Sequence, residues 1–202
     1  MSLIGITGGI GAGKSTVQGI LRELGVSCWD ADNAVHELYQ PGGEGLRRIV
    51  ERWGRNVLLA DGTLDRKAMA EQVFARPEKR EILEKLIHPL VRQHMRDTAA
   101  TAKGDLFCSV PLLYEFGWET EFRCVIAVWC DRMTQEERLR TRGWTEEEIR
   151  ARIAAQLPME EKLNRAEFAI ANNGSLKLLR EQCDRIVKAT TGIRQVEAII
   201  KF

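Results

Sequence analysis

A glycine-rich segment near the amino terminus carries the residues best suited to chemistry. Its sequence, Gly8-Gly9-Ile10-Gly11-Ala12-Gly13-Lys14-Ser15-Thr16, fits the phosphate-loop pattern G-x-x-x-x-G-K-[ST]. Glycines adopt positive φ angles and let the backbone approach a phosphate without a Cβ in the way. Lys14 offers a mobile positive charge to the β- and γ-phosphates of a nucleotide, and the Ser15 hydroxyl offers a ligand to Mg²⁺. The alternative is a glycine-rich turn with a chance lysine.

The elements that flank this segment favour a nucleotide site over a chance turn. An apolar strand candidate precedes it, and an apolar stripe with helical spacing follows it at Val17, Ile20, Leu21 and Leu24. Gly25 then supplies a stop. Successive backbone N–H groups and the positive end of the following helix together make a cradle for an anion. The sequence therefore predicts that this loop binds the phosphates of a nucleotide.

Two carboxylates follow the next strand candidate, which covers residues 26–29 and ends in Asp30-Ala31-Asp32. If the chain stays extended here, period-two alternation points both carboxylates the same way. They then lie at the carboxyl end of the strand, where open α/β sheets bind ligands. Asp32 is positioned to accept a proton from a substrate hydroxyl or to hold a magnesium-bound water. The alternative role for Asp32 is to cap the helix that follows, and one residue can serve both roles.

The stretch from Pro41 to Lys103 is predicted to be an all-helical insertion, because its short apolar runs recur at helical spacing. Within it, Asp65 is expected to cap a helix. A proline inside a helix costs about 3 kcal/mol, so at His88-Pro89 the helix either kinks or a new helix begins with Pro89. Both options redirect His88, which we predict to contact substrate. The alternative is that His88 bonds a broken helix end.

A further buried strand candidate, residues 106–110, leads into Pro111-Leu112-Leu113-Tyr114-Glu115. Many phosphate-loop enzymes place an aspartate at the end of such a strand to hold the magnesium shell, and this chain has Ser109 there. The difference shifts metal binding onto Ser15 and Asp32. Glu115 is either a substitute for the missing carboxylate or a solvated loop charge.

A pair of helices predicted after the strand candidate at 124–130 has the properties of a lid. Capping boxes at Thr134 and Thr145 are expected to open these helices, and Gly143 between them is a candidate hinge. Arg138 and Arg142 are four residues apart and are expected on one helix face. Arginines that close over a triphosphate neutralise the transferring group and exclude water. The alternative is a solvated pair of helices laced with Glu–Arg pairs, which the charge pattern by itself favours.

The last strand candidate, residues 168–171, is followed by Asn172-Asn173-Gly174-Ser175. Asn-Gly is a turn dipeptide, and Ser175 is expected to cap the final helix. Because this loop follows a strand at the ligand-binding edge of the sheet, next to the lid, it is positioned to frame an adenine ring.

Size and composition exclude several classes of protein. A chain of 202 residues, 44% hydrophobic and 29% charged, is long enough for one sizeable core with inserted subdomains. The net charge of +1 leaves no broad basic field for nucleic acid. No apolar run approaches the roughly 18 residues of a membrane span, and no signal-peptide pattern opens the chain. The cysteines are odd in number and lack a C-x-x-C, which indicates reduced core residues of a cytosolic protein: Cys28, Cys108, Cys124, Cys130 and Cys183.

With these segments placed, the whole chain resembles the dephospho-CoA kinase family of P-loop kinases. The phosphate loop is shared with many families, whereas the Asp-Ala-Asp, His-Pro and Pro-Leu-Leu segments in this order are far more specific. The chain departs from many members at Ser109 and Glu167, where those members have aspartate. The resemblance rests on these segments: Ile6 to Ser15, Asp30-Ala31-Asp32, Ile87-His88-Pro89-Leu90-Val91, Val110-Pro111-Leu112-Leu113-Tyr114-Glu115, Arg138-Leu139, Gln156-Leu157-Pro158, Lys162 and Asn172-Asn173-Gly174-Ser175.

The resemblance implies an α/β, three-layer P-loop kinase fold with a five-stranded parallel sheet in a single domain over residues 1–202. The nucleotide-binding core would comprise residues 1–32, 104–137 and 166–202, the helical CoA-substrate subdomain 33–103, and the helical lid 138–165. The implied reaction moves the γ-phosphoryl group of ATP to the ribose 3′-hydroxyl of dephospho-CoA, with Mg²⁺, in the final step of coenzyme A synthesis. The protein is then expected in the cytoplasm as a monomer or small homo-oligomer, with a small-molecule substrate and neither nucleic acid nor membrane as partner.

The resemblance also implies roles for individual residues. The implied catalytic residues are Lys14, Asp32 as base for the ribose hydroxyl, and Arg142 closing from the lid. Ser15 would ligate Mg²⁺ directly, and Asp32 would hold it through a water molecule. The implied nucleotide-binding residues are Gly9, Ile10, Gly11, Ala12, Gly13, Lys14, Ser15, Thr16, Arg138, Asn172 and Gly174. The implied substrate-binding residues are Thr7, Asp32, His88, Leu112 and Glu115.

Two other functions fit parts of the pattern. One is a different small-molecule kinase, acting on a nucleoside monophosphate or a metabolite hydroxyl, which the large helical insertion and His88 argue against. The other is a nucleotide-binding switch or regulatory module. GTP-binding switches need N-K-x-D and D-x-x-G segments, and the sequence has neither. An ATP-gated binding module stays open.

Overall fold

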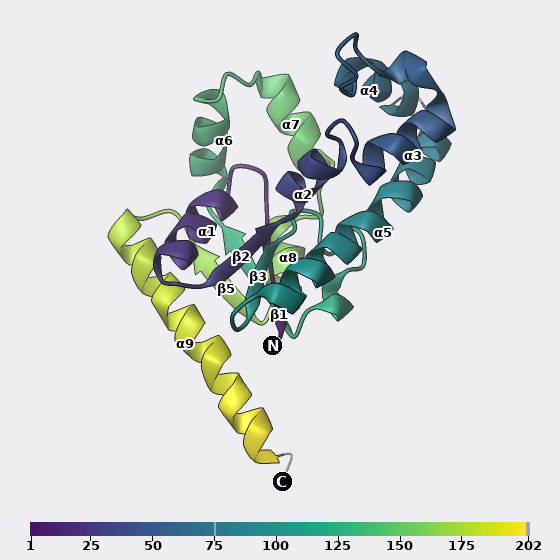
Figure 1. The fold of residues 1–202 in the computed structure, drawn as a ribbon. Helices are drawn as coiled ribbons and strands as arrows, with labels where there is room; N and C mark the ends of the chain where they lie inside the picture. The colour runs from purple at the N-terminus through teal and green to yellow at the C-terminus, as the bar shows by residue number, and fades with distance from the viewer. Residues whose placement is uncertain (75, 201–202) are drawn as a thin grey trace. The chain divides into compact units, whose positions relative to one another are not determined.

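The computed structural model describes residues 1–74 and 76–200, and within them five short, largely apolar segments form a sheet (Figure 1). The strands are β1 (Leu3–Gly8), β2 (Ser27–Asp30), β3 (Leu106–Ser109), β4 (Cys124–Trp129) and β5 (Phe168–Ala171). Their spatial order is β2-β3-β1-β4-β5. β1 pairs in parallel with β3 and β4, and β4 pairs in parallel with β5. The predicted α/β fold with a five-stranded parallel sheet is confirmed for this part of the chain.

The central strands are continuous apolar runs, as expected where helices cover both faces of a parallel sheet. β1, β3 and β4 are buried along nearly their whole length. Full burial of one large aliphatic side chain stabilises a fold by about 1.5–3 kcal/mol. The core of the sheet therefore fixes the strand ends that lead into the functional loops. Its buried members include Ile4, Ile6, Val17, Leu21, Phe107, Ile126, Val128, Ile170, Leu179 and Cys183.

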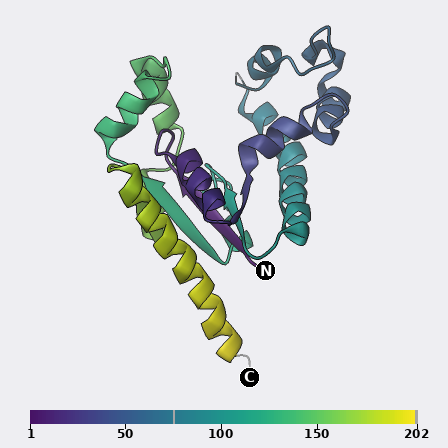
Figure 2. The same ribbon diagram turned by 60° about the vertical axis from the view of Figure 1, so that its left-hand side comes forward.

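One compact unit, Met1–Trp29 with Ala102–Phe202, contains the sheet strands and their covering helices. The helices described in it are α1 (Lys14–Glu23), α6 (Arg132–Arg140), α7 (Glu146–Ala154), α8 (Met159–Arg165) and α9 (Leu176–Ile200), with the 3₁₀ turn η2 (Glu119–Glu121). α1 and α9 contact each other and lie side by side against the sheet (Figures 1 and 2). α8 packs against β1 and β4, and α6 packs against α7.

The second compact unit, Asp30–Thr101, is helical. It contains α2 (Ala31–Leu38), α3 (Glu44–Trp53), the 3₁₀ turn η1 (Arg55–Val57), α4 (Arg66–Phe74) and α5 (Pro77–Thr101). α5 contacts α2, α3 and α4, and its buried stripe comprises Ile87, Val91, Met95 and Ala99. The predicted helical nature of this stretch is confirmed in the described residues. Asp65 accepts hydrogen bonds from the backbone N–H groups of Lys67 and Ala68, as predicted for a cap.

The Asp30-Ala31-Asp32 segment differs from its prediction. β2 ends at Asp30, whose side chain accepts hydrogen bonds from the N–H groups of Asp32 and Asn33 and so caps α2. The extended chain needed for strand alternation therefore stops at Asp30, and the condition on which the common direction of the two carboxylates depended is not met. Asp32 does not cap α2 but lies in its first turn, where a carboxylate is favourable to the helix dipole.

The start and end of α6 also differ from the prediction. The Asp131 side chain accepts the N–H of Thr134, so the helix begins at Arg132 and the predicted capping box at Thr134 is wrong. The helix ends at Arg140, and helical spacing therefore does not place Arg142 on a common face with Arg138.

Other helix boundaries follow the sequence. Thr145 and Glu148 form the predicted capping box of α7, and the Ser175 hydroxyl accepts the N–H of Leu178 at the start of α9. α5 continues through Pro89, so no new helix begins there. Cys28, Cys108, Cys124, Cys130 and Cys183 are free thiols, as predicted. In the part of the chain that the structure describes, no helix has the length and apolar composition needed to cross a membrane.

Candidate active site

The phosphate loop joins β1 to α1, and its shape depends on two glycines. Gly13 has a φ angle of 95°, and a Cβ added there would lie 2.0 Å from Nδ2 of Asn172. Gly8 has a φ angle of 150°, and a Cβ there would lie 2.1 Å from the carbonyl oxygen of Val128. Because side chains rarely adopt these angles and find no room here, sterics require both framing glycines of the pattern.

The amino end of α1 is open to an anion. No side chain caps α1, which is also true of α3 and α8, whereas side chains cap α2, α6 and α7. The first N–H groups of a helix lack partners within the helix and carry the positive end of its dipole. Ser15 and Thr16 are exposed at this end, and the Lys14 ammonium donates to the carbonyl oxygens of Gly8 at 2.8 Å and Gly9 at 3.1 Å. The predicted phosphate-binding groups therefore lie together around one loop.

Three amide side chains from distant parts of the sequence hold this loop. Gln135 Nε2 donates to the carbonyl oxygen of Ile10 at 2.6 Å, and the Ile10 N–H donates to Gln156 Oε1 at 2.9 Å. Asn172 is 6% exposed, and its Nδ2 donates to the carbonyl oxygen of Ala12 at 2.9 Å. The loop is therefore organised by the protein itself, which lowers the entropy cost of binding a ligand.

Arg138 of α6 reaches the same loop. Its Nη2 donates to the carbonyl oxygen of Asn172 at 2.9 Å. Its Nη1 is buried and would lie 3.8 Å from a Cβ added at Gly13. This atom has no hydrogen-bond partner among the described residues. An unsatisfied buried donor is costly, so this N–H is suited to an acceptor that a ligand brings. The structure thus brings together the predicted nucleotide residues Arg138 and Asn172.

Glu115 is not a solvated loop charge. Its side chain is 15% exposed and pairs at 2.7 Å with Nζ of Lys162, which is 0% exposed. The Leu157 N–H donates to the same carboxylate at 2.9 Å, and Lys162 also donates to the carbonyl oxygen of Pro111 at 2.8 Å. Burial lowers the pKa of Lys162, and the adjacent Glu115 opposes that shift. The pair ties the chain after β3 to α8, and the Leu157 N–H ties the same carboxylate to the chain before α8.

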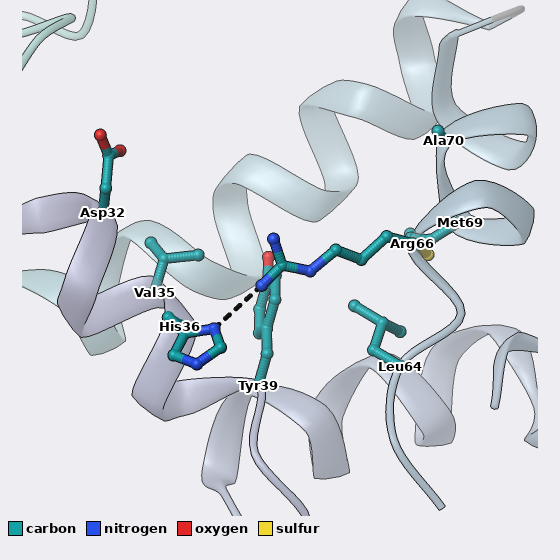
Figure 3. Close-up of a pocket in the computed structure, with 8 residues that line it drawn as sticks. All are labelled: Asp32, Val35, His36, Tyr39, Leu64, Arg66, Met69 and Ala70. Atoms are coloured by element: carbon teal, nitrogen blue, oxygen red, sulfur yellow. Dashed lines mark hydrogen bonds between the residues drawn. The ribbon is translucent and has the colours of Figure 1, made fainter. Parts of the chain in front are cut away.

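A pocket of about 420 Å³ opens within the helical unit (Figure 3). One face of α2 and the residue after it form the first wall of the pocket, because four lining residues have the helical spacing i, i+3, i+4 and i+7. These residues are Asp32, Val35, His36 and Tyr39. The second wall is the start of α4 and the chain before it, with Leu64, Arg66, Met69 and Ala70. Asp32 therefore lines an apolar-walled pocket with few polar groups, which is typical of sites for organic ligands.

The structure places His88 outside this pocket. His88 is half-buried on α5 and is not among the described residues that line the pocket. Burial lowers the pKa of His88; the Glu84 carboxylate opposes the shift and the Arg92 charge adds to it. Its contact with substrate stays a prediction.

Thr7 and Leu112 lie in the unit that holds the sheet. Thr7 is fully buried, and its hydroxyl donates to the carbonyl oxygen of Pro111 at 3.1 Å. Leu112 is half-buried in the turn after β3. The hydroxyl of Thr7 thus has a structural partner, and the binding of substrate by both residues stays a prediction.

The connection between α6 and α7 carries Arg142 on an exposed turn beside Gly143, whose φ angle is 83°. Arg140 forms ion pairs with Glu136 and Glu146, as the alternative of a Glu–Arg laced surface predicts. Among the described residues Arg142 forms no such pair, so its charge is not neutralised. Its role as a lid residue stays a prediction.

The donor atoms at the loop fit Mg²⁺. Among the described residues, no group of three or more His, Cys, Asp or Glu side chains is arranged to hold a metal. Mg²⁺ usually takes only one or two protein oxygens together with waters and substrate phosphates. The exposed Ser15 hydroxyl at the start of α1 is a hard oxygen donor of this kind. The predicted metal would therefore bind together with the nucleotide.

Sequence reasoning missed several supporting residues. His36, Tyr39 and Arg66 line the pocket with Asp32, and the helical spacing from Asp32 was a signal for the first two. Gln156 entered only as part of the family resemblance. Neither it nor Gln135 carried a local signal of its contact, because their partner Ile10 lies 146 and 125 positions away.

With the phosphate loop between the first strand and first helix of a five-stranded parallel sheet, the chain has the fold of the P-loop kinases. Shikimate kinase from Acinetobacter baumannii has the same fold, with a TM-score of 0.55 over 95% of this chain and 94% of that chain at 15% identity. Within that class, the chain belongs to the dephospho-CoA kinase family, whose model matches residues 2–177.

Individual relatives agree with this assignment. Dephospho-CoA kinase from Anaeromyxobacter dehalogenans is 43% identical over 199 residues, which cover 96% of this chain and 94% of the relative. The crystal structure of TT1252 from Thermus thermophilus has a TM-score of 0.82 at 35% identity and covers 94% of this chain and 97% of that chain. The family predicted from the sequence motifs is confirmed.

Proposed function

We propose that this chain transfers the γ-phosphoryl group of ATP to the ribose 3′-hydroxyl of dephospho-CoA, giving coenzyme A and ADP in the final step of coenzyme A synthesis. The observation that carries the proposal is the uncapped amino end of α1 behind two sterically required glycines, in a chain of the dephospho-CoA kinase family. A helix end of this kind binds phosphate through its backbone N–H groups and its dipole.

On the donor side, the backbone from Gly9 to Thr16 holds the ATP phosphates, and Lys14 stabilises the β- and γ-phosphates. Arg138 offers its buried N–H beside Gly13, and Asn172 with Gly174 frames the adenine ring. Arg142 closes from its exposed turn and counts most as charge develops in the transition state. The lid is proposed to span residues 138–165, and the nucleotide-binding core residues 1–32, 104–137 and 166–202, of which 201–202 lie outside the described residues.

On the acceptor side, residues 33–103 form the proposed CoA-substrate subdomain. Asp32 accepts the proton of the ribose hydroxyl, a role that contributes about 10²–10⁴-fold to a rate. The pocket that Asp32 lines supports this proposal, because it offers apolar walls next to a carboxylate. Thr7, His88, Leu112 and Glu115 are proposed to shape the rest of the acceptor site.

Ser15 is the proposed direct ligand of Mg²⁺, and Asp32 is proposed to hold the ion through a water molecule. When bound, the ion would neutralise charge on the reacting phosphates. Phosphoryl transfer needs little covalent help, so the contribution of the chain itself is positioning, proton acceptance and exclusion of water.

The test is turnover by the full-length chain with Mg-ATP. ADP release and coenzyme A are measured with dephospho-CoA, AMP, CMP or adenosine as acceptor. We expect coenzyme A from dephospho-CoA and little ADP with the others. A Lys14→Met variant controls for contaminating kinases, and Lys103→Met, at an exposed lysine before β3, is its matched control. Transfer to AMP or CMP alone would assign a different small-molecule kinase, and nucleotide binding without transfer would assign a binding module.

We further propose a cytoplasmic enzyme that works as a monomer or small homo-oligomer on a small molecule, without nucleic acid or membrane as partner. The five free thiols and the net charge of +1 support this setting. Cell fractionation and gel filtration of the purified chain test the two statements separately.

A further inference from the structure

The pocket of the helical unit contains a guanidinium that a neutral side chain holds in place. Arg66 lies at the first position of α4, and its Nη2 is 3.0 Å from Nδ1 of His36 on α2. Figure 3 shows the Arg66 side chain extending from α4 to α2, with its guanidinium beside the rings of His36 and Tyr39. Among the described residues that line the pocket, Arg66 is the only arginine or lysine.

The hydrogen-bond pattern defines the tautomer of His36. An arginine can only donate, so Nδ1 of His36 must accept, and a neutral imidazole then carries its proton on Nε2. Gln40 Nε2 lies 2.9 Å from that Nε2 and donates to the His36 carbonyl oxygen at 3.3 Å, so with this tautomer the Gln40 amide must be turned for its oxygen to accept from His36. Among the described residues Arg66 forms no ion pair. His36 therefore positions the positive charge without neutralising it.

Tyr39 completes the polar end of the pocket. Burial raises the pKa of Tyr39 to about 12, and the nearby Arg66 charge opposes that shift. The phenol is therefore protonated at neutral pH and offers a hydrogen bond beside the guanidinium. A guanidinium with a neighbouring O–H suits a phosphate oxyanion, because arginine binds phosphate through two parallel N–H groups.

The spacing of the polar groups matches one ligand class. Asp32 and His36 are four residues apart on one face of α2, which corresponds to about 6 Å along the helix axis. In an adenosine 5′-diphosphate ester, the 3′-hydroxyl and the 5′-phosphate are attached to the same ribose ring. A ribose whose hydroxyl meets Asp32 can therefore bring its diphosphate to Arg66, while the apolar wall takes the organic part. That wall comprises Val35, Leu64, Met69 and Ala70.

We propose that Arg66 binds the 5′-diphosphate of the acceptor and so selects dephospho-CoA over nucleosides that lack a diphosphate, with His36 as its positioning residue. This inference rests on the proposed function for the identity of the acceptor, and it adds which group of the acceptor is recognised and by which side chain. The apolar wall and the carboxylate alone accept any adenosine, whereas the held guanidinium discriminates between acceptors.

The test is calorimetric binding to the full-length protein, kept saturated with Mg²⁺ and a non-hydrolysable ATP analogue so that the phosphate loop is occupied. The titrants are dephospho-CoA, ADP-ribose, which has the diphosphate, and adenosine, which lacks it. The proteins are wild type, Arg66→Met, Arg66→Lys and His36→Ala. Arg55→Met is the matched control, because Arg55 is an exposed arginine of the same unit outside the pocket lining.

In Arg66→Met, the loss of charge-assisted hydrogen bonds is expected to raise the Kd for dephospho-CoA and for ADP-ribose about 10- to 100-fold. The Kd for adenosine should change by less than about twofold. Arg66→Lys should fall between wild type and Arg66→Met, because it keeps the charge and loses the fork. His36→Ala should weaken the binding of ADP-ribose less than Arg66→Met does. Arg55→Met should bind all three titrants with wild-type affinity. In turnover, KM for dephospho-CoA should rise in Arg66→Met by the same factor while kcat falls far less.

If Arg66→Met weakens the binding of adenosine and of ADP-ribose by the same factor, the inference is overturned, because Arg66 would then shape the pocket as a whole. Unchanged affinity for ADP-ribose, or no binding of it by wild type, would overturn it as well. Circular dichroism checks folding, and Arg66→Lys carries the test if Arg66→Met does not fold. Wild type that makes no coenzyme A but binds ADP-ribose through Arg66 contradicts the proposed function alone. Coenzyme A formation with affinities independent of Arg66 contradicts this inference alone.

Discussion

The variant Lys162→Met should destabilise the protein far more than the loss of an ordinary surface lysine. The Lys162 side chain is 0% exposed, and its Nζ contacts the Glu115 carboxylate at 2.7 Å and the Pro111 carbonyl oxygen at 2.8 Å. Methionine has a similar length and leaves little cavity, so packing changes little. What remains is a largely buried carboxylate without its counterion, and removal of one partner of a buried pair costs about 3–5 kcal/mol.

A double-mutant cycle separates this cost from general damage. Glu115→Gln removes the charge that Lys162→Met leaves behind. The double variant should therefore lose less free energy of unfolding than the two single variants lose in sum. We expect a coupling free energy of about 1–3 kcal/mol, measured by urea unfolding followed through tryptophan fluorescence. The matched control is Lys188→Met, which removes an exposed i,i+4 pair with Asp184 and should cost less than about 1 kcal/mol.

The reasoning is refuted if Lys162→Met costs no more than Lys188→Met, or if the cycle is additive. Either result would mean that Glu115 is hydrated in solution and that the pair does not hold α8 to the chain after β3. The slope of free energy against urea concentration must stay constant across the variants, because a changed slope would indicate a change in how the protein unfolds.

Four further outcomes are expected. Asp32→Asn should lower kcat at least about tenfold while the fold is kept and the unfolding midpoint falls only slightly, and wild-type turnover would remove Asp32 from the mechanism. Arg142→Ala should lower kcat more than it weakens ATP binding in calorimetry, whereas equal losses would mark a clamp of the ground state. Gly13→Ala should abolish ATP binding, because its Cβ would lie 2.0 Å from Asn172 Nδ2 at a φ angle of 95°, and Gly19→Ala, which meets nothing within 4 Å, is its control. Burial lowers the pKa of His88, so near and below its ordinary value of 6.5 the unfolded chain binds more protons than the native one, and the free energy of unfolding falls as the pH is lowered. His88→Asn should reduce this loss of stability between about pH 7 and pH 5.5 in urea unfolding.

Local chemistry made much of this fold predictable. The phosphate loop, the apolar strands and the capping box at Thr145 each depend on residues within a few positions of one another. The errors arose where two neighbouring residues compete for one task. Asp131 lies three residues before Thr134 and accepts its N–H, and Asp30 caps the helix for which Asp32 was the alternative cap. A sequence pattern shows both candidates without showing which one wins.

The features that depend on distant partners could not be predicted. A lysine is almost always exposed, so only the tertiary structure reveals that Lys162 is buried against Glu115. The pocket could be predicted only in part. The wall from α2 follows from helical spacing, whereas the position of Arg66 opposite His36 depends on how α2 and α4 each pack against α5.

The amide contacts of the phosphate loop have a consequence for synthesis of the chain. Asn172 bonds to Ala12 across 160 positions, so the ribosome releases the complete glycine-rich signature long before the residues that give it its final form. ATP can therefore bind the finished loop of the nascent chain only after Asn172 has left the ribosome. A fragment truncated before Asn172 would keep every letter of the signature and still lack a rigid nucleotide cradle.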